Sequence, residues 1–257
     1  MTRKIPFEAI ENFRDFGDYA AGQKRIKPRL LFRSAHQAEA TQADLEAMKA
    51  LGIGLILDLR RPNERERMPG RRYAGFNGVV IENHEGTEGE DPWHLFLKES
   101  DLSVNSMQDY LRVYYDRAPH EGRHIDLFSR WFEALAEAPG PALVHCAAGK
   151  DRTGIVCALT HHIAGVHPDD IVEDYLLTND PDRFAKRGPL FADHVEELTG
   201  RRPSPEAMVA AMGVEAEYLH KAFDAMKARH GSIDGYLEQV LGVEAKRRAA
   251  IEEHILV

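Results

Sequence analysis

A thiol, a carboxylate and a guanidinium lie within seven consecutive residues of this chain. Cys146 is followed, after five intervening residues, by Arg152, and Asp151 stands directly before that arginine. A short apolar run at 142–144 predicts a buried strand that ends near the thiol. An apolar-periodic segment from about Thr153 predicts a helix. We therefore expect the thiol at the carboxyl end of a strand, just before the N-terminus of a helix.

This placement suits chemistry on an anion. Backbone N–H groups of such a loop point inward and, together with the positive end of the helix dipole, form an anion site. The same field favours the thiolate form of Cys146. The planar fork of Arg152 can hold two oxygens of a phosphoryl group. The positions expected to contact a bound phosphate are Ala147, Ala148, Gly149, Lys150 and Thr153.

The full string at 145–154, HCAAGKDRTG, is more specific than the Cys-to-Arg spacing alone. It matches the signature of the cysteine-dependent phosphatases. It resembles a bacterial branch of them, the tyrosine-protein phosphatase family whose loop carries Lys-Asp before the arginine. The stretches 12–19, 29–34 and 231–237 also look like parts of that family. A buried cysteine beside a surface arginine is the alternative, and it leaves these other matching positions unexplained.

The resemblance implies a protein-tyrosine phosphatase that works through a cysteinyl-phosphate intermediate. The Cys146 thiolate would attack phosphorus, while the loop N–H groups and Arg152 hold the three equatorial oxygens. Water would then release phosphate, with no metal or other cofactor involved. Thr153 is expected to donate a hydrogen bond to the thiolate. His145 is expected to organise the loop rather than to act as a base.

The leaving oxygen of the substrate needs a proton donor. Many tyrosine phosphatases carry this aspartate in a Trp-Pro-Asp sequence, which does not occur here. Asp151 is the substitute that the resemblance suggests; its alternative role is a rim carboxylate paired with Arg152 or Lys150. Asp58 is the second candidate, because it follows the apolar run at 53–57 and open α/β sheets bind ligands at the carboxyl edge.

The expected substrates are phosphorylated proteins or phosphoinositides. Loops of phosphatases that accept inositol lipids often carry an extra cation, and Lys150 would place an ammonium at the rim. This position predicts activity on phosphoinositides. Activity on phosphoserine and phosphothreonine beside phosphotyrosine, as in a dual-specificity enzyme, is part of the same hypothesis. The alternative is that Lys150 only balances the charge of Asp151.

Two other classes of function stay open. A catalytically inactive phosphate-binding module usually loses the cysteine or the arginine, and both are present here. A thiol enzyme of rhodanese or arsenate-reductase type needs a different loop or a resolving cysteine. Cys157 lies on the predicted helix, where a small buried apolar residue is its expected role.

Composition limits the class of protein further. The 257 residues include only two cysteines and carry a net charge of −9. Two cysteines exclude a disulfide framework, and the acidic balance argues against nucleic acid as a partner. No cysteine or histidine spacing suggests a zinc site. No apolar run is long enough for a membrane span, and the N-terminus lacks a secretory signal, so we expect a cytoplasmic protein. Leaderless secretion would leave no mark in the sequence.

Apolar periodicity predicts an α/β order along the chain. Strands are expected at 29–34, 53–57, 78–81 and 142–144, and helices at 41–51, 127–135, from about Thr153 to Gly165, and from Pro168 onward. This order implies right-handed crossovers in a central parallel sheet. By resemblance, the sheet has four to five strands flanked by helices, with added helices in the C-terminal third and the loop at the carboxyl edge.

One phosphatase domain over 1–257 is the expected organisation. Within it, 92–124 is predicted to form either a lid or ordinary packing helices, and 180–257 a helical C-terminal part. The charged segment 60–72 is interpreted as a solvated loop of mixed sign in preference to a substrate-binding one.

Overall fold

A five-stranded sheet forms the centre of the computed structural model, which describes residues 3–84, 91–137 and 140–257. The strands lie in the order β1 (Arg14–Asp15), β4 (Leu31–Ser34), β7 (Ala142–His145), β5 (Leu55–Asp58) and β6 (Val79–Ile81). All neighbours pair in parallel except β1, which is antiparallel to β4. The predicted α/β class with a mostly parallel sheet of four to five strands is confirmed, and the strand that leads to the thiol is central.

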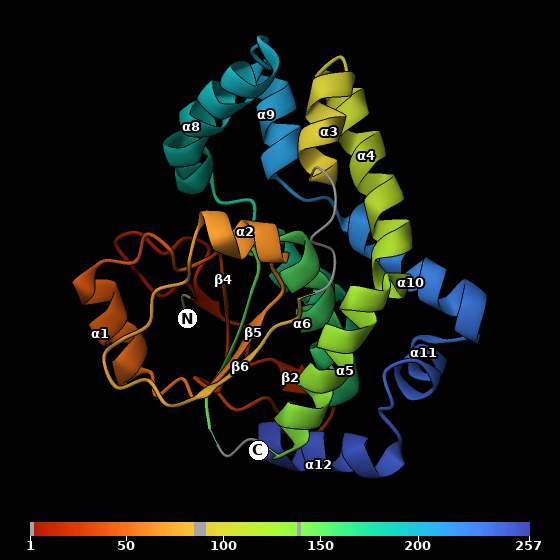
Figure 1. Ribbon diagram of the computed structural model, residues 1–257. Coiled ribbons are helices and arrows are strands. Elements are labelled where there is room, and N and C mark those ends of the chain that lie inside the picture. Colours follow the sequence, from red (N-terminus) through yellow and green to blue (C-terminus); the bar gives the residue numbers. More distant parts are fainter. Residues whose placement is uncertain (1–2, 85–90, 138–139) are drawn as a thin grey trace.

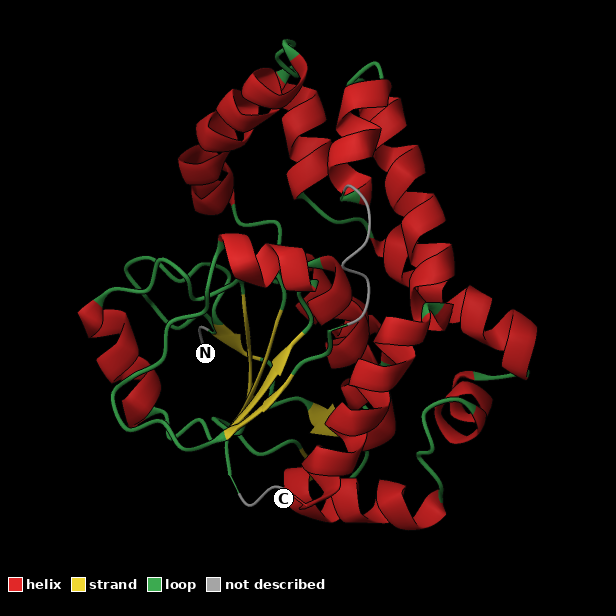
Figure 2. Cartoon of the chain, in the orientation of Figure 1, coloured by secondary structure: helices red, strands yellow, loops and turns green. Residues whose placement is uncertain are grey.

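Helices cover both faces of this sheet (Figures 1 and 2). The helices of the described chain are α1 (Gln42–Ala50), α2 (Pro62–Arg67), α3 (Pro92–Glu99), α4 (Val104–Arg117), α5 (Gly122–Glu137), α6 (Asp151–Ala164), α7 (Pro168–Leu176), α8 (Pro181–Thr199), α9 (Pro205–Met212), α10 (Ala216–His230), α11 (Ile233–Gln239) and α12 (Ala245–Ile255). Short elements complete the described chain: β2 (Ala20–Ala21), β3 (Lys24–Arg25) and the 3₁₀ turn Ala118–His120.

Alternate residues of the central strands point to opposite faces of the sheet, as the two-residue period of a strand requires, and are buried in different cores. One set packs with α5 and α6: Leu31, Leu55, Leu57, Ala142 and Val144. The other set packs with α1: Phe32, Ile56 and Leu143. The predicted apolar stripe of α5 lies fully buried in the first core: Leu127, Phe128, Trp131, Phe132 and Leu135. The central strands are therefore covered on both faces, which is why they read as continuous apolar runs.

Several helix ends lie where local sequence signals predict them. Thr41 caps α1 by accepting from the N–H of Asp44, whose carboxylate accepts from the Thr41 N–H in return. Gly165 ends α6 with φ +81°, a conformation that glycine adopts without strain. Pro168 occupies the first turn of α7. The predicted end of α5 at Pro139 and most of the predicted loop at 82–91 lie outside the described residues.

The interpretation of 60–72 as a solvated loop is wrong for its first half. Residues 62–67 form α2, and Arg60 is buried beside it. Pro62 starts the helix, and the Glu64 carboxylate accepts from the N–H of Arg61 at 2.7 Å, which satisfies one N-terminal donor. The charges are tolerated because they are paired within the protein.

A second group of helices stands over the carboxyl edge of the sheet (Figure 1). Helices α3, α4, α8 and α9 pack on one another around a small apolar cluster that is separate from the two cores of the sheet. Its buried members are Leu97, Leu102, Met107, Val195 and Ala211. Segment 92–124 is thus built of packed helices, and its motion as a lid stays a prediction. Within the described residues, no helix combines the length and apolarity needed to cross a membrane.

A buried ion cluster joins the sheet to α7. Arg33 of β4 donates to Asp174 at 2.8 Å, and its neighbour Arg14 on β1 lies 3.5 Å from the same carboxylate. Both arginines therefore form structural ion pairs. Burial alone would raise the pKa of Asp174, but Arg14 and Arg33 outweigh it and lower this pKa to about 2.

We expect Asp174→Asn to lower the free energy of unfolding near neutral pH by about 3–5 kcal/mol, because two buried guanidinium groups lose their counter-charge. The Asp174 pKa is lower in the folded than in the unfolded chain, so this stabilisation is complete above the unfolded value of 3.8 and is lost as pH falls toward about 2. Urea denaturation across that range should therefore show a shrinking difference between wild type and variant. Asp170→Asn, on the same helix but outside the cluster, is the control. A difference that persists at acid pH would contradict the assignment.

Candidate active site

Cys146 follows β7 directly and lies in the lining of a large cavity. The strand ends at His145, the loop follows, and α6 begins at Asp151. The cavity has a volume of about 740 Å³ and is lined by Cys146, Ala147, Ala148, Lys150, Asp151 and Arg152, together with side chains of α2, α3, α4 and α8. Cys146 is only 2% exposed, and it belongs to the lining of this cavity, through which a substrate would approach its thiol.

The N-terminal segment binds the carbonyl groups of the loop. Asn12 donates its side-chain amide to the carbonyl of Gly149 at 2.8 Å, and Arg33 donates to the same oxygen at 3.1 Å. The N–H of His36 donates to the carbonyl of Ala147 at 3.1 Å. The side-chain contacts come from the stretches 12–19 and 29–34, and the backbone contact comes from His36, just after β4. They explain why the segment before the sheet belongs to the site.

Two glycines of the loop string leave room that a side chain would fill. Gly149 has φ +65°, and a Cβ there would collide with the backbone of Ser34 and Ala35. A Cβ on Gly154 would lie 2.8 Å from two ring carbons of Tyr175 on α7. The loop therefore packs against β4 on one side, and the helix that follows it packs against α7.

Arg152 is held by a carboxylate from α2. Its Nη1 and Nη2 donate to the two oxygens of Glu64 at 2.5 and 2.8 Å, and Nη1 also donates to the carbonyl of Leu59 at 3.1 Å. Burial would raise the pKa of Glu64, but Arg152 outweighs it and lowers this pKa to about 2. Sequence reasoning missed Glu64. The available signal was Pro62, two residues before Glu64, because proline is typical of the first turn of a helix.

The side chains of Asp151 and Lys150 line the cavity and are both bound by groups from other helices. The Asp151 Oδ1 atom accepts from the hydroxyl of Tyr115 at 2.9 Å and lies 3.7 Å from Nζ of Lys150. The Lys150 ammonium donates to the carbonyl groups of Ala211 and Gly213 at the end of α9. The Lys150 side chain is 7% exposed, so its ammonium is engaged inside the protein instead of at the predicted position on the rim.

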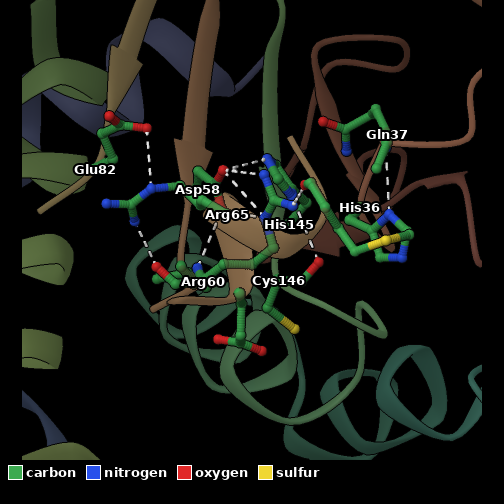
Figure 3. A network of polar contacts seen from close by, with 12 residues as sticks. His36, Gln37, Asp58, Arg60, Arg65, Glu82, His145 and Cys146 are labelled. Atoms are coloured by element: carbon green, nitrogen blue, oxygen red, sulfur yellow. Dashed lines mark hydrogen bonds and ion pairs between the residues drawn. The ribbon is translucent and has the colours of Figure 1, made fainter. Parts of the chain in front are cut away.

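Asp58 is not brought to the cavity of Cys146. It lies in a network shown in Figure 3, where Arg60 donates to it at 2.7 Å and Nε2 of His145 lies 3.6 Å away. It lines a smaller hollow next to Arg72. Burial would raise the pKa of Asp58, but His145 and Arg60 together hold it well below its usual range. The Asp58 carboxylate binds Arg60 and His145 at the ends of the strands. Because its lowered pKa keeps it ionised, it is poorly suited to donate a proton.

The two remaining predicted positions are buried. Burial is the main cause that lowers the pKa of His145 to about 3, so its ring is neutral near pH 7, as a loop organiser requires. The hydroxyl of Thr153 has no hydrogen-bond partner among the described residues, so the expected bond to Cys146 is not formed. Cys157 is buried as well, and burial raises the pKa of its thiol to about 12, which fits its expected inert role.

A thiol at the end of a central parallel strand, a tight loop, and an arginine held above it define the class of cysteine-phosphatase-like proteins. The tyrosine phosphatase family model matches residues 5–257, and the chain belongs to that family. It is thus a tyrosine-protein phosphatase, a hydrolase of phosphoric monoesters, and the expected resemblance to this family is confirmed.

Named relatives agree with this family. A putative tyrosine-protein phosphatase of Cupriavidus necator is 31% identical over 93% of this chain and 85% of its own length. The triple specificity protein phosphatase PtpB of Mycobacterium tuberculosis is 30% identical over 92% of each chain. A tyrosine-protein phosphatase of Nostoc commune is 29% identical over 81% of this chain and 68% of its own.

We expect Glu64→Gln to lower kcat/KM on p-nitrophenyl phosphate by about ten- to a hundredfold, because a charge-assisted pair that orients Arg152 is lost. The inhibition constant of vanadate should rise in parallel, since the same guanidinium holds its oxygens. Glu66→Gln removes an exposed carboxylate from the same helix and should change neither value. Equal effects of the two substitutions would show that charge alone, and not the pair, is responsible.

Proposed function

We propose that this phosphatase hydrolyses phosphotyrosine through a cysteinyl-phosphate intermediate, and that it also accepts phosphoserine, phosphothreonine and phosphoinositides. The observation that carries the mechanism is the position of Cys146 on the cavity floor with Arg152 oriented beside it by Glu64. An inactive phosphate-binding module is disfavoured, because Cys146 and Arg152 are both present and the Glu64 carboxylate orients the arginine.

In the first step the sulfur of Cys146 attacks phosphorus from the side opposite the leaving oxygen. The S–P bond forms as the P–O bond breaks, and its electron pair passes to the leaving oxygen, which takes a proton from Asp151. In the second step water attacks phosphorus, the Asp151 carboxylate accepts a proton from it, and the S–P bond breaks to regenerate the thiolate. No electron transfer is involved.

Arg152 and the N–H groups of the loop would stabilise the equatorial oxygens in both steps. A guanidinium has five N–H donors, and three contacts of Arg152 go to Glu64 and Leu59. The donors that remain would face the phosphoryl group with the loop N–H groups. Such donors, held in place before the substrate arrives, usually supply the largest contribution to the rate.

The acid role is assigned to Asp151 in preference to Asp58. Asp151 lines the same cavity as Cys146, whereas Asp58 lines a separate hollow and is held ionised by its neighbours. A proton donor must lie within reach of the leaving oxygen, so position favours Asp151 over Asp58.

The breadth of substrates is supported by the walls of the cavity. Its volume lies within the range of pockets for small-molecule ligands. Arg61 of the α2 start and Arg117 at the end of α4 both line it, so a substrate with further phosphates would meet cations beyond the loop. Aromatic walls, among them Trp93 and Tyr110, suit a phenyl ring. One relative is named a triple specificity protein phosphatase.

The nucleophile and the substrate range are tested together. We expect the wild type to release phosphate from a phosphotyrosine peptide, a phosphoserine peptide and phosphoinositide vesicles, and Cys146→Ser to release it from none. Vanadate should still bind Cys146→Ser, because the backbone and Arg152 persist. Malachite-green assays and vanadate titration measure both. Substantial turnover by a folded Cys146→Ser would reject the mechanism, and a lack of lipid turnover by the wild type would reject the breadth.

The acid is tested by the choice of leaving group. Asp151→Asn should lower kcat/KM on phenyl phosphate by about 10²–10⁴-fold and on p-nitrophenyl phosphate by much less, because the activated leaving group needs little protonation. Asp58→Asn should change both substrates by the same factor, through a loss of stability. The opposite pattern in these two variants would move the acid role to Asp58.

A further inference from the structure

Two buried tyrosines form a chain of hydrogen bonds that ends at the side chain of Asp151. The hydroxyl of Tyr175 on α7 donates to the hydroxyl of Tyr115 on α4 at 2.7 Å, and Tyr115 donates to Oδ1 of Asp151 at 2.9 Å. The exposed fractions of the tyrosines are 1% and 0%, so solvent does not compete for these bonds. The contacts link two helices, far apart in the sequence, to one carboxylate of the phosphate loop.

We propose that Tyr115 and Tyr175 are positioning residues that turn Asp151 toward the leaving group and leave its Oδ2 atom to carry the transferred proton. The inference rests on the proposed acid role of Asp151 and adds the means by which that role is achieved.

The direction of the hydrogen bonds selects the oxygen. A phenol has one proton to donate. The proton of Tyr115 goes to Oδ1, while the oxygen of Tyr115 accepts from Tyr175. Lys150 also approaches Oδ1, at 3.7 Å. No hydrogen bond within the described chain reaches Oδ2, so that oxygen is the one left for the acid proton.

Both phenols remain donors at any pH at which the enzyme would work. Burial, followed by the charge of Asp151, raises the pKa of Tyr115 well above its usual value, and the same two causes raise that of Tyr175. A donor that never ionises gives a constant orientation to the carboxylate.

The surrounding packing makes the two tyrosines rigid. The ring of Tyr175 occupies the space that Gly154 leaves open. The ring of Tyr115 stacks on Tyr218 of α10, with 5.6 Å between the ring centroids. Without such a partner, an aspartate in the first turn of α6 would be drawn to the unpaired N–H groups of its own helix or to Arg152. The bond from Tyr115 offers a competing, fixed position.

The test compares two leaving groups in single-hydroxyl variants. We expect Tyr115→Phe to lower kcat/KM about tenfold on phenyl phosphate, the effect of one lost hydrogen bond, and to change it less than about twofold on p-nitrophenyl phosphate. Tyr175→Phe should show the same pattern more weakly. Tyr218→Phe is the matched control: it removes a hydroxyl from the buried ring stacked on Tyr115, but that hydroxyl donates to Glu215. It should not change the ratio of the two substrates.

A double variant separates this inference from the assignment of the acid. If Tyr115 acts through Asp151, Asp151→Asn with Tyr115→Phe should be no slower on phenyl phosphate than Asp151→Asn alone. Additive losses, or equal losses on both substrates from Tyr115→Phe, would overturn the positioning role while Asp151→Asn still identifies the acid. If Asp151→Asn itself is insensitive to the leaving group, both proposals fall. Thermal unfolding of each variant excludes a loss of fold, and Tyr175→Phe serves in place of Tyr115→Phe if the latter does not fold.

Discussion

The site depends on how the carbonyl groups of one short loop are satisfied. A loop that offers its N–H groups to an anion must place its carbonyl groups elsewhere, and buried carbonyl groups need donors. Asn12, Arg33 and the backbone of His36 provide them. Because Gly149 has no side chain, β4 can approach closely enough for these bonds to form. The N-terminal segment is therefore as much a part of the candidate site as the loop itself.

Buried charges around the loop are paired before any substrate enters. Arg152 meets Glu64, Arg33 meets Asp174, and Arg60 meets Asp58. Burying such a pair contributes little to stability, because desolvation offsets most of the attraction. Its benefit here is geometric, since each guanidinium is held in one orientation. This separates carboxylates that fix cations, such as Glu64 and Asp58, from Asp151, whose second oxygen has no partner in the described chain.

An acid placed inside the phosphate loop differs from one carried on a separate mobile segment. Its distance from the nucleophile is set by covalent structure, so only its orientation must be controlled. Helices α4 and α7 supply that control from the core through Tyr115 and Tyr175. In the proposed mechanism, α4 thus lines the cavity and, together with α7, holds the proposed acid.

The sequence alone determined the parts of this protein that depend on near neighbours. The loop string, the strand before it, the helix after it and the caps at Thr41 and Gly165 are local patterns, and the structure contains each of them. The parallel sheet followed from the order of these elements. Strong local signals sufficed because capping and glycine conformations involve only a few residues.

Only the tertiary structure decided which distant charges and hydroxyls meet. Glu64 lies 88 residues before Arg152, and Tyr115 lies 36 residues before Asp151. The high density of charge at 60–72 led to the prediction of a solvent-exposed loop, because a sequence does not reveal that a charged residue has a buried partner. For the same reason Asp58 looked like a site residue at the correct sheet edge, although Arg60 and His145 hold it away from the cavity. Pairing across the fold depends on packing, which no local pattern encodes.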